Sequence, residues 1–98
     1  MRLTEHEIKM IKKAFNETFE VGQIYLFGSR VDNTKRGGDI DLYIDIPYQL
    51  NISEKLNKKS QFRLKLYDMI GEQKIDVVIS QDKNRSIEKE ALRTGVLL

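Results

Sequence analysis

The chain has 98 residues, enough for one small domain, and we expect residues 1–98 to fold as a single domain without a separate substrate-binding domain. Its 17 lysines and arginines nearly balance its 15 aspartates and glutamates, and the net charge of +2 disfavours a nucleic-acid-binding module. The lack of cysteine excludes disulfides and thiolate zinc sites. The stretch MRLTEHEIKM has no apolar signal-peptide core, and no apolar run reaches membrane-spanning length, so we expect a soluble cytoplasmic protein.

The first predicted element is an amphipathic helix over residues 4–19. Thr4 and Glu7 have the spacing of a capping box, in which each side chain bonds the backbone N–H of the other residue. Apolar residues then recur at helical spacing, and they are Ile8, Ile11, Ala14, Phe15 and Phe19. The β-rich stretch QIYLF, residues 23–27, is the first predicted strand, and it stops at Gly28.

A polar segment, residues 29–37, comes next, and we expect a loop with one helical turn there. Residues 39–46 then alternate between the two faces of a second strand. The apolar face carries Ile40, Leu42, Ile44 and Ile46, and the other face carries Asp39, Asp41, Tyr43 and Asp45. Pro47 ends this strand because it cannot continue the hydrogen-bond ladder. We expect Asp45 to be exposed.

A second long helix is predicted over residues 52–70, with Gly71 at its C-terminal end. Its core candidates are Leu56, Phe62, Leu66, Met69 and Ile70. The stretch KIDVVIS, residues 74–80, is the third strand, and Ser86 is suited to cap a final helix. We expect the apolar tail, residues 96–98, to favour the surface of a partner over the core of so small a domain. This order predicts an α+β fold of two layers, a small mixed sheet of about three strands with helices packed on it.

Carboxylates occupy strand positions where aspartate is normally depleted. Asp39 and Asp41 share one face with Cα atoms about 6.5–7 Å apart, and two ionised groups there repel each other unless a cation lies between them. In the third strand, Asp76 points away from its apolar neighbours, so adjacent strands would bring all three carboxylates together. Mg²⁺ prefers such oxygen ligands, and the set suits two-metal phosphoryl transfer. The competing interpretation is a group of solvated charges that protects an edge strand.

The turn FGSR supplies candidate phosphate-binding groups. Gly28 lets the backbone approach a ligand closely, and Ser29 begins a turn whose N–H groups suit phosphate oxygens. Arg30 fits a phosphate contact and a structural pair with a carboxylate equally well. Lys35 and Arg36 also suit phosphate, although we favour solvated loop charges for both.

A basic stripe is predicted on the second long helix. Lys55, Lys59 and Arg63 follow one another at intervals of four residues, which places them on one side of a helix. Such a stripe is usually a solvent face, and an acidic or nucleic-acid partner is the alternative.

Three separated pieces of the sequence match the order and spacing of a known superfamily. Gly28-Ser29 is followed after nine residues by Asp39-Ile40-Asp41-Leu42, and later by Ile75-Asp76-Val77. This set resembles the DNA polymerase β-type nucleotidyltransferase superfamily. The short length and FGSR are similar to its minimal nucleotidyltransferase (MNT) proteins, which are often antitoxins paired with HEPN-domain toxins. The resemblance covers nearly the whole chain.

The resemblance implies a nucleotidyltransferase fold and a role for each motif. Gly28 and Ser29 would hold the nucleoside triphosphate. Asp39 and Asp41 would bind a pair of Mg²⁺ ions. Asp76 would complete the metal site and help to activate the acceptor hydroxyl.

The chain departs from the superfamily pattern at Gly38, where relatives commonly have serine or threonine. The hydrogen bond that such a hydroxyl would make is therefore absent.

Other families with clustered aspartates fit less well. An EF-hand would need a ligand where Tyr43 stands. A haloacid dehalogenase-type phosphatase is normally much longer and lacks the Gly-Ser turn, and a P-loop would need Gly-Lys-Ser/Thr, which this chain does not contain.

The implied reaction transfers AMP from ATP to a hydroxyl of a HEPN-type partner protein and releases pyrophosphate, which would make the chain the antitoxin of a toxin–antitoxin pair. The alternative is a binding antitoxin with a weak or inactive site, which neutralises its toxin by complex formation alone. The base preference, the acceptor and the state of homo- or hetero-oligomerisation stay open at this stage.

Overall fold

The structure is a computed structural model that describes residues 2–32 and 38–98, with the backbone alone for Ser29. Its elements, in chain order, are α1 (Glu5–Phe19), β1 (Gln23–Phe27), a 3₁₀ helix η1 (Gly28–Val31), β2 (Ile40–Asp45), α2 (Ile52–Ile70), β3 (Ile75–Ile79), α3 (Ser86–Thr94) and β4 (Val96–Leu97). The predicted α+β class is confirmed, but the sheet has four strands and not three. Within the described ranges, no helix combines the length and the apolar character needed to cross a membrane.

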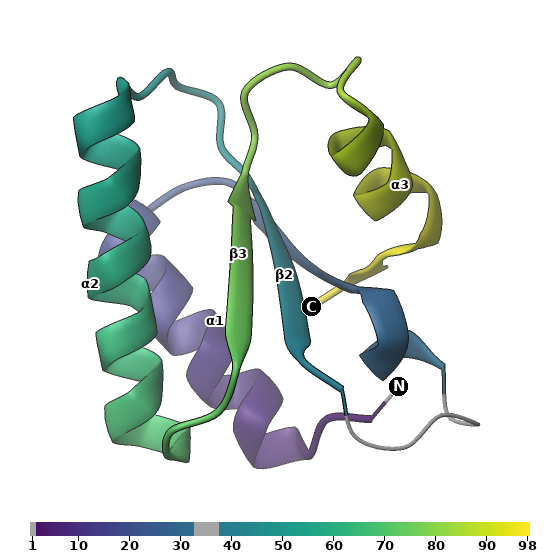
Figure 1. Ribbon diagram of the computed structural model, residues 1–98. Coiled ribbons are helices and arrows are strands. Elements are labelled where there is room, and N and C mark those ends of the chain that lie inside the picture. The colour runs from purple at the N-terminus through teal and green to yellow at the C-terminus, as the bar shows by residue number, and fades with distance from the viewer. Residues whose placement is uncertain (1, 33–37) are drawn as a thin grey trace.

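The sheet has the strand order β3-β2-β1-β4, with β3 and β2 side by side (Figure 1). β1 pairs antiparallel with both β2 and β4, whereas β2 and β3 are parallel. Parallel neighbours cannot be joined by a tight turn, and α2 provides the long connection that they need. The N-terminal ends of β2 and β3 therefore lie side by side at the same end of the sheet.

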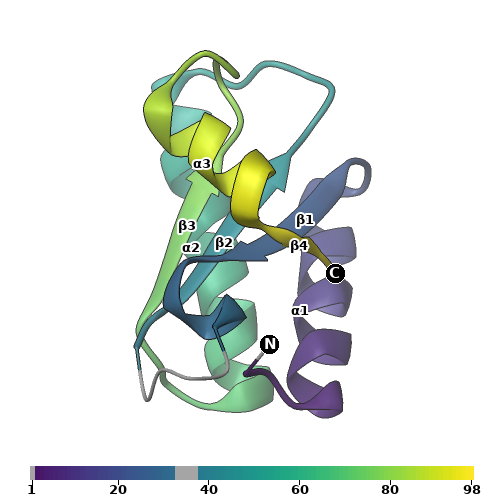
Figure 2. The same cartoon turned by 90° about the vertical axis from the view of Figure 1, so that its right-hand side faces the viewer.

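The two faces of the sheet are covered by different helices (Figure 2). α1 and α2 pack on one face, where Phe19 and Phe62 meet the alternating apolar side chains of the strands. α3 covers part of the opposite face, where Phe27, Tyr43 and Ala91 form a second buried cluster. Asp41 lies on this second face, because it is two residues from Tyr43 in β2.

Capping side chains explain where the two long helices begin. Thr4 and Glu7 form the predicted capping box at α1, and Asn51 and Glu54 form a second one at α2. The predicted cap of the last helix was wrong. Ser86 is the first residue of α3, and the N-cap residue before it makes no side-chain cap bond. The capping box together with the apolar pattern correctly predicted where α1 begins, whereas a single serine did not predict the cap of α3.

Three further expectations were wrong because of where the chain packs. Leu56 is 60% exposed, since it lies away from the face of α2 that meets the core. The Asp45 side chain is only 19% exposed and pairs with Lys83, whose Nζ lies 3.2 Å from its Oδ2. The C-terminal tail pairs with the chain's own sheet as β4, and Leu98 donates its backbone N–H to the Ile24 carbonyl at 3.0 Å.

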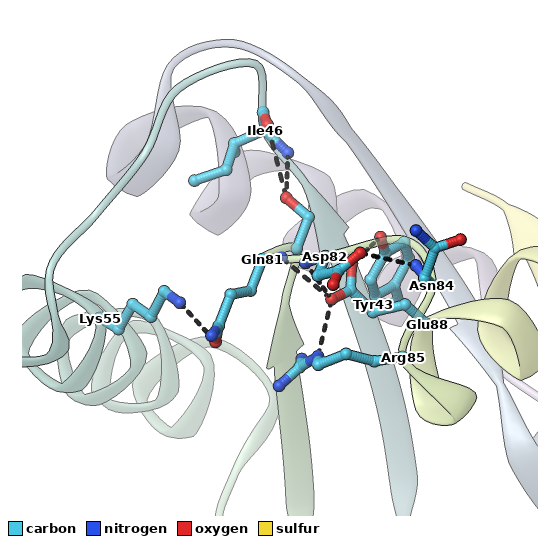
Figure 3. A network of polar contacts seen from close by, with 9 residues as sticks. Tyr43, Ile46, Lys55, Gln81, Asp82, Asn84, Arg85 and Glu88 are labelled. Atoms are coloured by element: carbon cyan, nitrogen blue, oxygen red, sulfur yellow. Dashed lines mark hydrogen bonds and ion pairs between the residues drawn. The ribbon is translucent and has the colours of Figure 1, made fainter.

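A fully buried carboxylate joins α3 to the sheet (Figure 3). Glu88 accepts hydrogen bonds from the Tyr43 hydroxyl at 2.7 Å, the backbone N–H groups of Gln81 and Asp82 at 3.0 and 2.8 Å, and Arg85 Nε at 2.8 Å. Burial by itself raises the pKa of Glu88, but these donors lower it below the ordinary value. Burial and the Glu88 carboxylate raise the pKa of Tyr43. This network holds α3 over the face that carries Asp41.

Replacing Glu88 with glutamine should lower the free energy of unfolding by about 1–3 kcal/mol at neutral pH, because an amide cannot satisfy this set of donors. The pKa of Glu88 is lowered in the folded protein, so its stabilisation is present above the ordinary value of 4.5 and is lost as pH falls through the folded value. Urea unfolding of wild type and Glu88→Gln should show a difference that shrinks in acid. Glu90→Gln, at an exposed site of the same helix, is the control. A difference that does not change with pH would contradict this role.

Candidate active site

The three predicted carboxylates come together at the N-terminal ends of β2 and β3. Parallel pairing places Asp41 directly opposite Asp76, and Asp39 immediately precedes β2. One carboxylate oxygen from each residue can be chosen so that all three lie within 4.8 Å of one another. Asp39 and Asp41 are partly buried and Asp76 is exposed. The predicted convergence of the three side chains is therefore confirmed.

The electrostatics of this carboxylate triad favour a bound cation. Burial raises the pKa of Asp41, and the charges of Asp76 and Asp39 raise it further. Lys74 lowers it slightly, and its Nζ lies 3.4 Å from Asp39 Oδ2, but the lysine side chain is 75% exposed and its charge is well solvated. Compact oxygen ligands with unbalanced negative charge are the donors that Mg²⁺ selects. The triad thus fits the metal that the sequence predicted.

Glycine is required at position 28 because the backbone there lies against the Asp41 carboxylate. It has a φ of +77°, and a Cβ placed on its backbone would overlap Asp41 Oδ2. The antiparallel register explains this contact, since the preceding residue, Phe27, pairs with Asp41. Gly28 therefore leaves space for the Asp41 carboxylate, and its close approach to a ligand stays a prediction.

The turn after β1 is the 3₁₀ helix η1, which agrees with the expected single helical turn. The backbone of Ser29 lies in this turn beside the triad strand β2. Gly38 has a φ of +90°, in the region that side chains rarely adopt. This conformation accounts for glycine where the superfamily commonly has serine or threonine.

Arg30 contacts two backbone carbonyls, and its charge also helps to lower the pKa of the Glu7 carboxyl. It donates from Nη1 to the Arg2 carbonyl at 2.9 Å and from Nε to the Gly38 carbonyl at 3.3 Å. These contacts connect η1 to Arg2 and to the chain that enters Asp39, so Arg30 helps to position the site, and its phosphate contact stays a prediction. The sequence could not predict these contacts, because every residue has a backbone carbonyl and no residue type marks the partner. Lys35 and Arg36 lie outside the described residues.

A family model described as polymerase beta, nucleotidyltransferase, matches residues 9–98. The chain belongs to this family. The match includes the Gly28 turn and all three carboxylates, and it supports transfer of a nucleotidyl group as the general activity. A search of curated proteins found no match.

Gly28→Ala should weaken Mg²⁺ binding by about 10–100-fold, because the new Cβ displaces the Asp41 carboxylate. Gly71→Ala is the matched control, since Gly71 has a similar φ of +83° and a Cβ added there would lie in open space. Calorimetric titration with Mg²⁺ measures the difference between the two variants. Equal affinities would show that the Gly28 contact does not support the metal site.

Asp41→Asn should stabilise the metal-free protein at neutral pH, because it removes repulsion among partly buried carboxylates. The pKa of Asp41 is raised, so the metal-free wild type should lose stability as pH rises through that value. Mg²⁺ should raise the melting temperature of wild type and leave that of Asp41→Asn almost unchanged. Asp68→Asn, at an exposed site on α2, should behave as wild type. A less stable metal-free Asp41→Asn protein would contradict this account.

Proposed function

We propose that this protein transfers AMP from ATP to a hydroxyl group of a HEPN-type partner protein, and that it acts as the antitoxin of a toxin–antitoxin pair. The observation that carries the chemistry is the carboxylate triad on adjacent parallel strands, next to the Gly28 turn. The family match supports nucleotidyl transfer, and the resemblance to MNT proteins motivates the donor, the acceptor and the biological role.

Mg²⁺, when bound, would neutralise the triphosphate and lower the pKa of the attacking hydroxyl. Asp39, Asp41 and Asp76 would hold it. In the reaction, the acceptor oxygen forms a bond to the α-phosphorus, the bond from that phosphorus to the bridging oxygen breaks, and pyrophosphate leaves. Asp76 is the exposed member of the triad, so it is suited to receive the hydroxyl proton from an acceptor that arrives from solvent.

The triphosphate is assigned to the turn after β1. Gly28 has no side chain to obstruct a ligand, and the backbone of Ser29 follows it in η1. Arg30 holds η1 to the Gly38 carbonyl, and its guanidinium would add a contact to the triphosphate. The described helices and strands form the sheet and its helical cover, and the acceptor hydroxyl is proposed to lie on a separate protein.

Asp39→Asn combined with Asp41→Asn should abolish Mg²⁺-dependent ATP binding, because two of the three metal-holding carboxylates are then neutral. Binding is measured by calorimetry with ATP in the presence of Mg²⁺ and again in the presence of EDTA. The exposed pair Asp68→Asn and Asp82→Asn serves as the control. Undiminished ATP binding in the Asp39/Asp41 variant would refute the metal assignment.

Incubation with α-labelled ATP and a HEPN-domain protein distinguishes transfer from neutralisation by contact. A transferase should place the label on the partner, whereas γ-labelled ATP should leave its label in pyrophosphate. The Asp39/Asp41 variant should neither transfer label nor protect cells from the toxin. Protection without transfer would support the binding antitoxin instead.

A further inference from the structure

One face of α2 exposes large apolar side chains beside positive charges. Ile52 is 80% exposed and Leu56 is 60% exposed. Ile52, Leu56, Lys59 and Arg63 follow one another at intervals of four, three and four residues, which places them on one side of the helix. Two exposed apolar residues one turn apart, in a protein whose other apolar residues mostly pack inward, mark a candidate contact surface.

The two apolar residues line a groove at the N-terminal end of α2. The groove has a volume of about 720 Å³ and is also bounded by Leu50, Lys55, Lys59 and Gln81. Lys55 Nζ donates to Gln81 Oε1 at 2.8 Å, which connects the α2 wall to the segment that follows β3 (Figure 3). The groove is therefore built by two separate parts of the chain.

Within the described part of the chain, the positive charges along this face have no carboxylate partner. Among the ion pairs of residues 2–32 and 38–98, none involves Lys55, Lys59 or Arg63. Burial lowers the pKa of Lys59, and so do the charges of Arg63, Arg85 and Lys55. Of these three neighbours of Lys59, Arg85 is paired with an acidic residue, the buried Glu88. Half-buried cations crowded in this way favour an incoming anionic group.

Protection of the exposed edge of β3 explains only part of this pattern. Arg63 donates from Nε to the Ile75 carbonyl at 3.2 Å, so it covers one backbone group of the edge strand. Edge protection needs charge and gives no reason for Ile52 and Leu56 to be exposed. Nucleic acid is also a poor match. Phosphate contacts would use the cations but would give the two central apolar side chains no role. An acidic protein segment fits both the anchors and the charges.

We propose that Ile52, Leu56, Lys55 and Lys59 form a docking face for an acidic amphipathic helix of a partner protein. Apolar side chains spaced one turn apart on that helix pack against Ile52 and Leu56, and flanking carboxylates pair with Lys55 and Lys59. Gln81 follows the C-terminal end of β3 and Asp76 lies near its N-terminal end, so a docked helix leaves the carboxylate triad open. The proposal goes beyond nucleotidyl transfer, because docking requires neither ATP nor metal.

The probe is a fluorescently labelled helical peptide with leucines one turn apart and glutamates beside them. Its anisotropy should rise on titration with the protein, in EDTA and without ATP, and the binding should weaken with added salt. Ile52→Ser with Leu56→Ser should weaken binding by about tenfold or more. Lys55→Gln with Lys59→Gln should also weaken binding and should reduce its salt dependence. The second variant tests the proposal even if the first fails to fold.

Matched controls separate this face from the rest of the molecule. Leu64→Ser removes a 63% exposed leucine elsewhere on α2, and Lys9→Gln removes an exposed lysine of α1; both should bind as wild type. The Asp39/Asp41 variant should also bind the peptide, so failure of the proposed transfer reaction and failure of docking give different results. The proposal is overturned if the glutamate peptide does not bind, if the docking-face and control variants lose affinity equally, or if a lysine-flanked peptide or a single-stranded RNA oligomer binds more tightly.

Discussion

The parallel pairing of β2 and β3 is the constraint on which the site depends, because it sets Asp41 directly against Asp76. Two carboxylates in this register repel each other, and Asp39 adds a third negative charge at the point where the chain enters β2. Burial of both strands against α1 and α2 prevents the carboxylates from moving apart, since Ile40, Leu42 and Ile44 are held in the core on the other face. The core thus keeps in place an arrangement of charges that is unfavourable without a cation.

Several local features follow from that pairing. A parallel neighbour requires a long connection, which α2 supplies, and the same helix carries the proposed docking face at its N-terminal end. The antiparallel register of β1 brings Gly28 against Asp41, where a side chain would have no space. Arg30 then holds η1 to the Gly38 carbonyl. On the same face of the sheet, Glu88 fixes α3 to β2 through Tyr43.

Strong local patterns made much of this predictable. Alternation in residues 39–46 predicted both the strand and its acidic face, and the capping box at Thr4 predicted where α1 begins. Apart from Asp76 in the triad, partners distant in sequence were not predictable. The pairing of β4 with β1, the burial of Glu88 beneath four donors and the carbonyl contacts of Arg30 depend on segments that only the folded chain brings together. The exposure of Leu56 was missed because helical spacing identifies an apolar residue without showing whether its side of the helix is covered.

The most direct test of the metal site is a crystal structure of the protein grown with Mn²⁺ and a non-hydrolysable ATP analogue. Mn²⁺ accepts the same oxygen ligands as Mg²⁺ and is located by its anomalous scattering. We expect anomalous peaks within coordination distance of Asp39, Asp41 and Asp76, with the triphosphate against the turn that begins at Gly28. Ordered nucleotide elsewhere, or no anomalous peak at the three carboxylates, would contradict the assignment of this site.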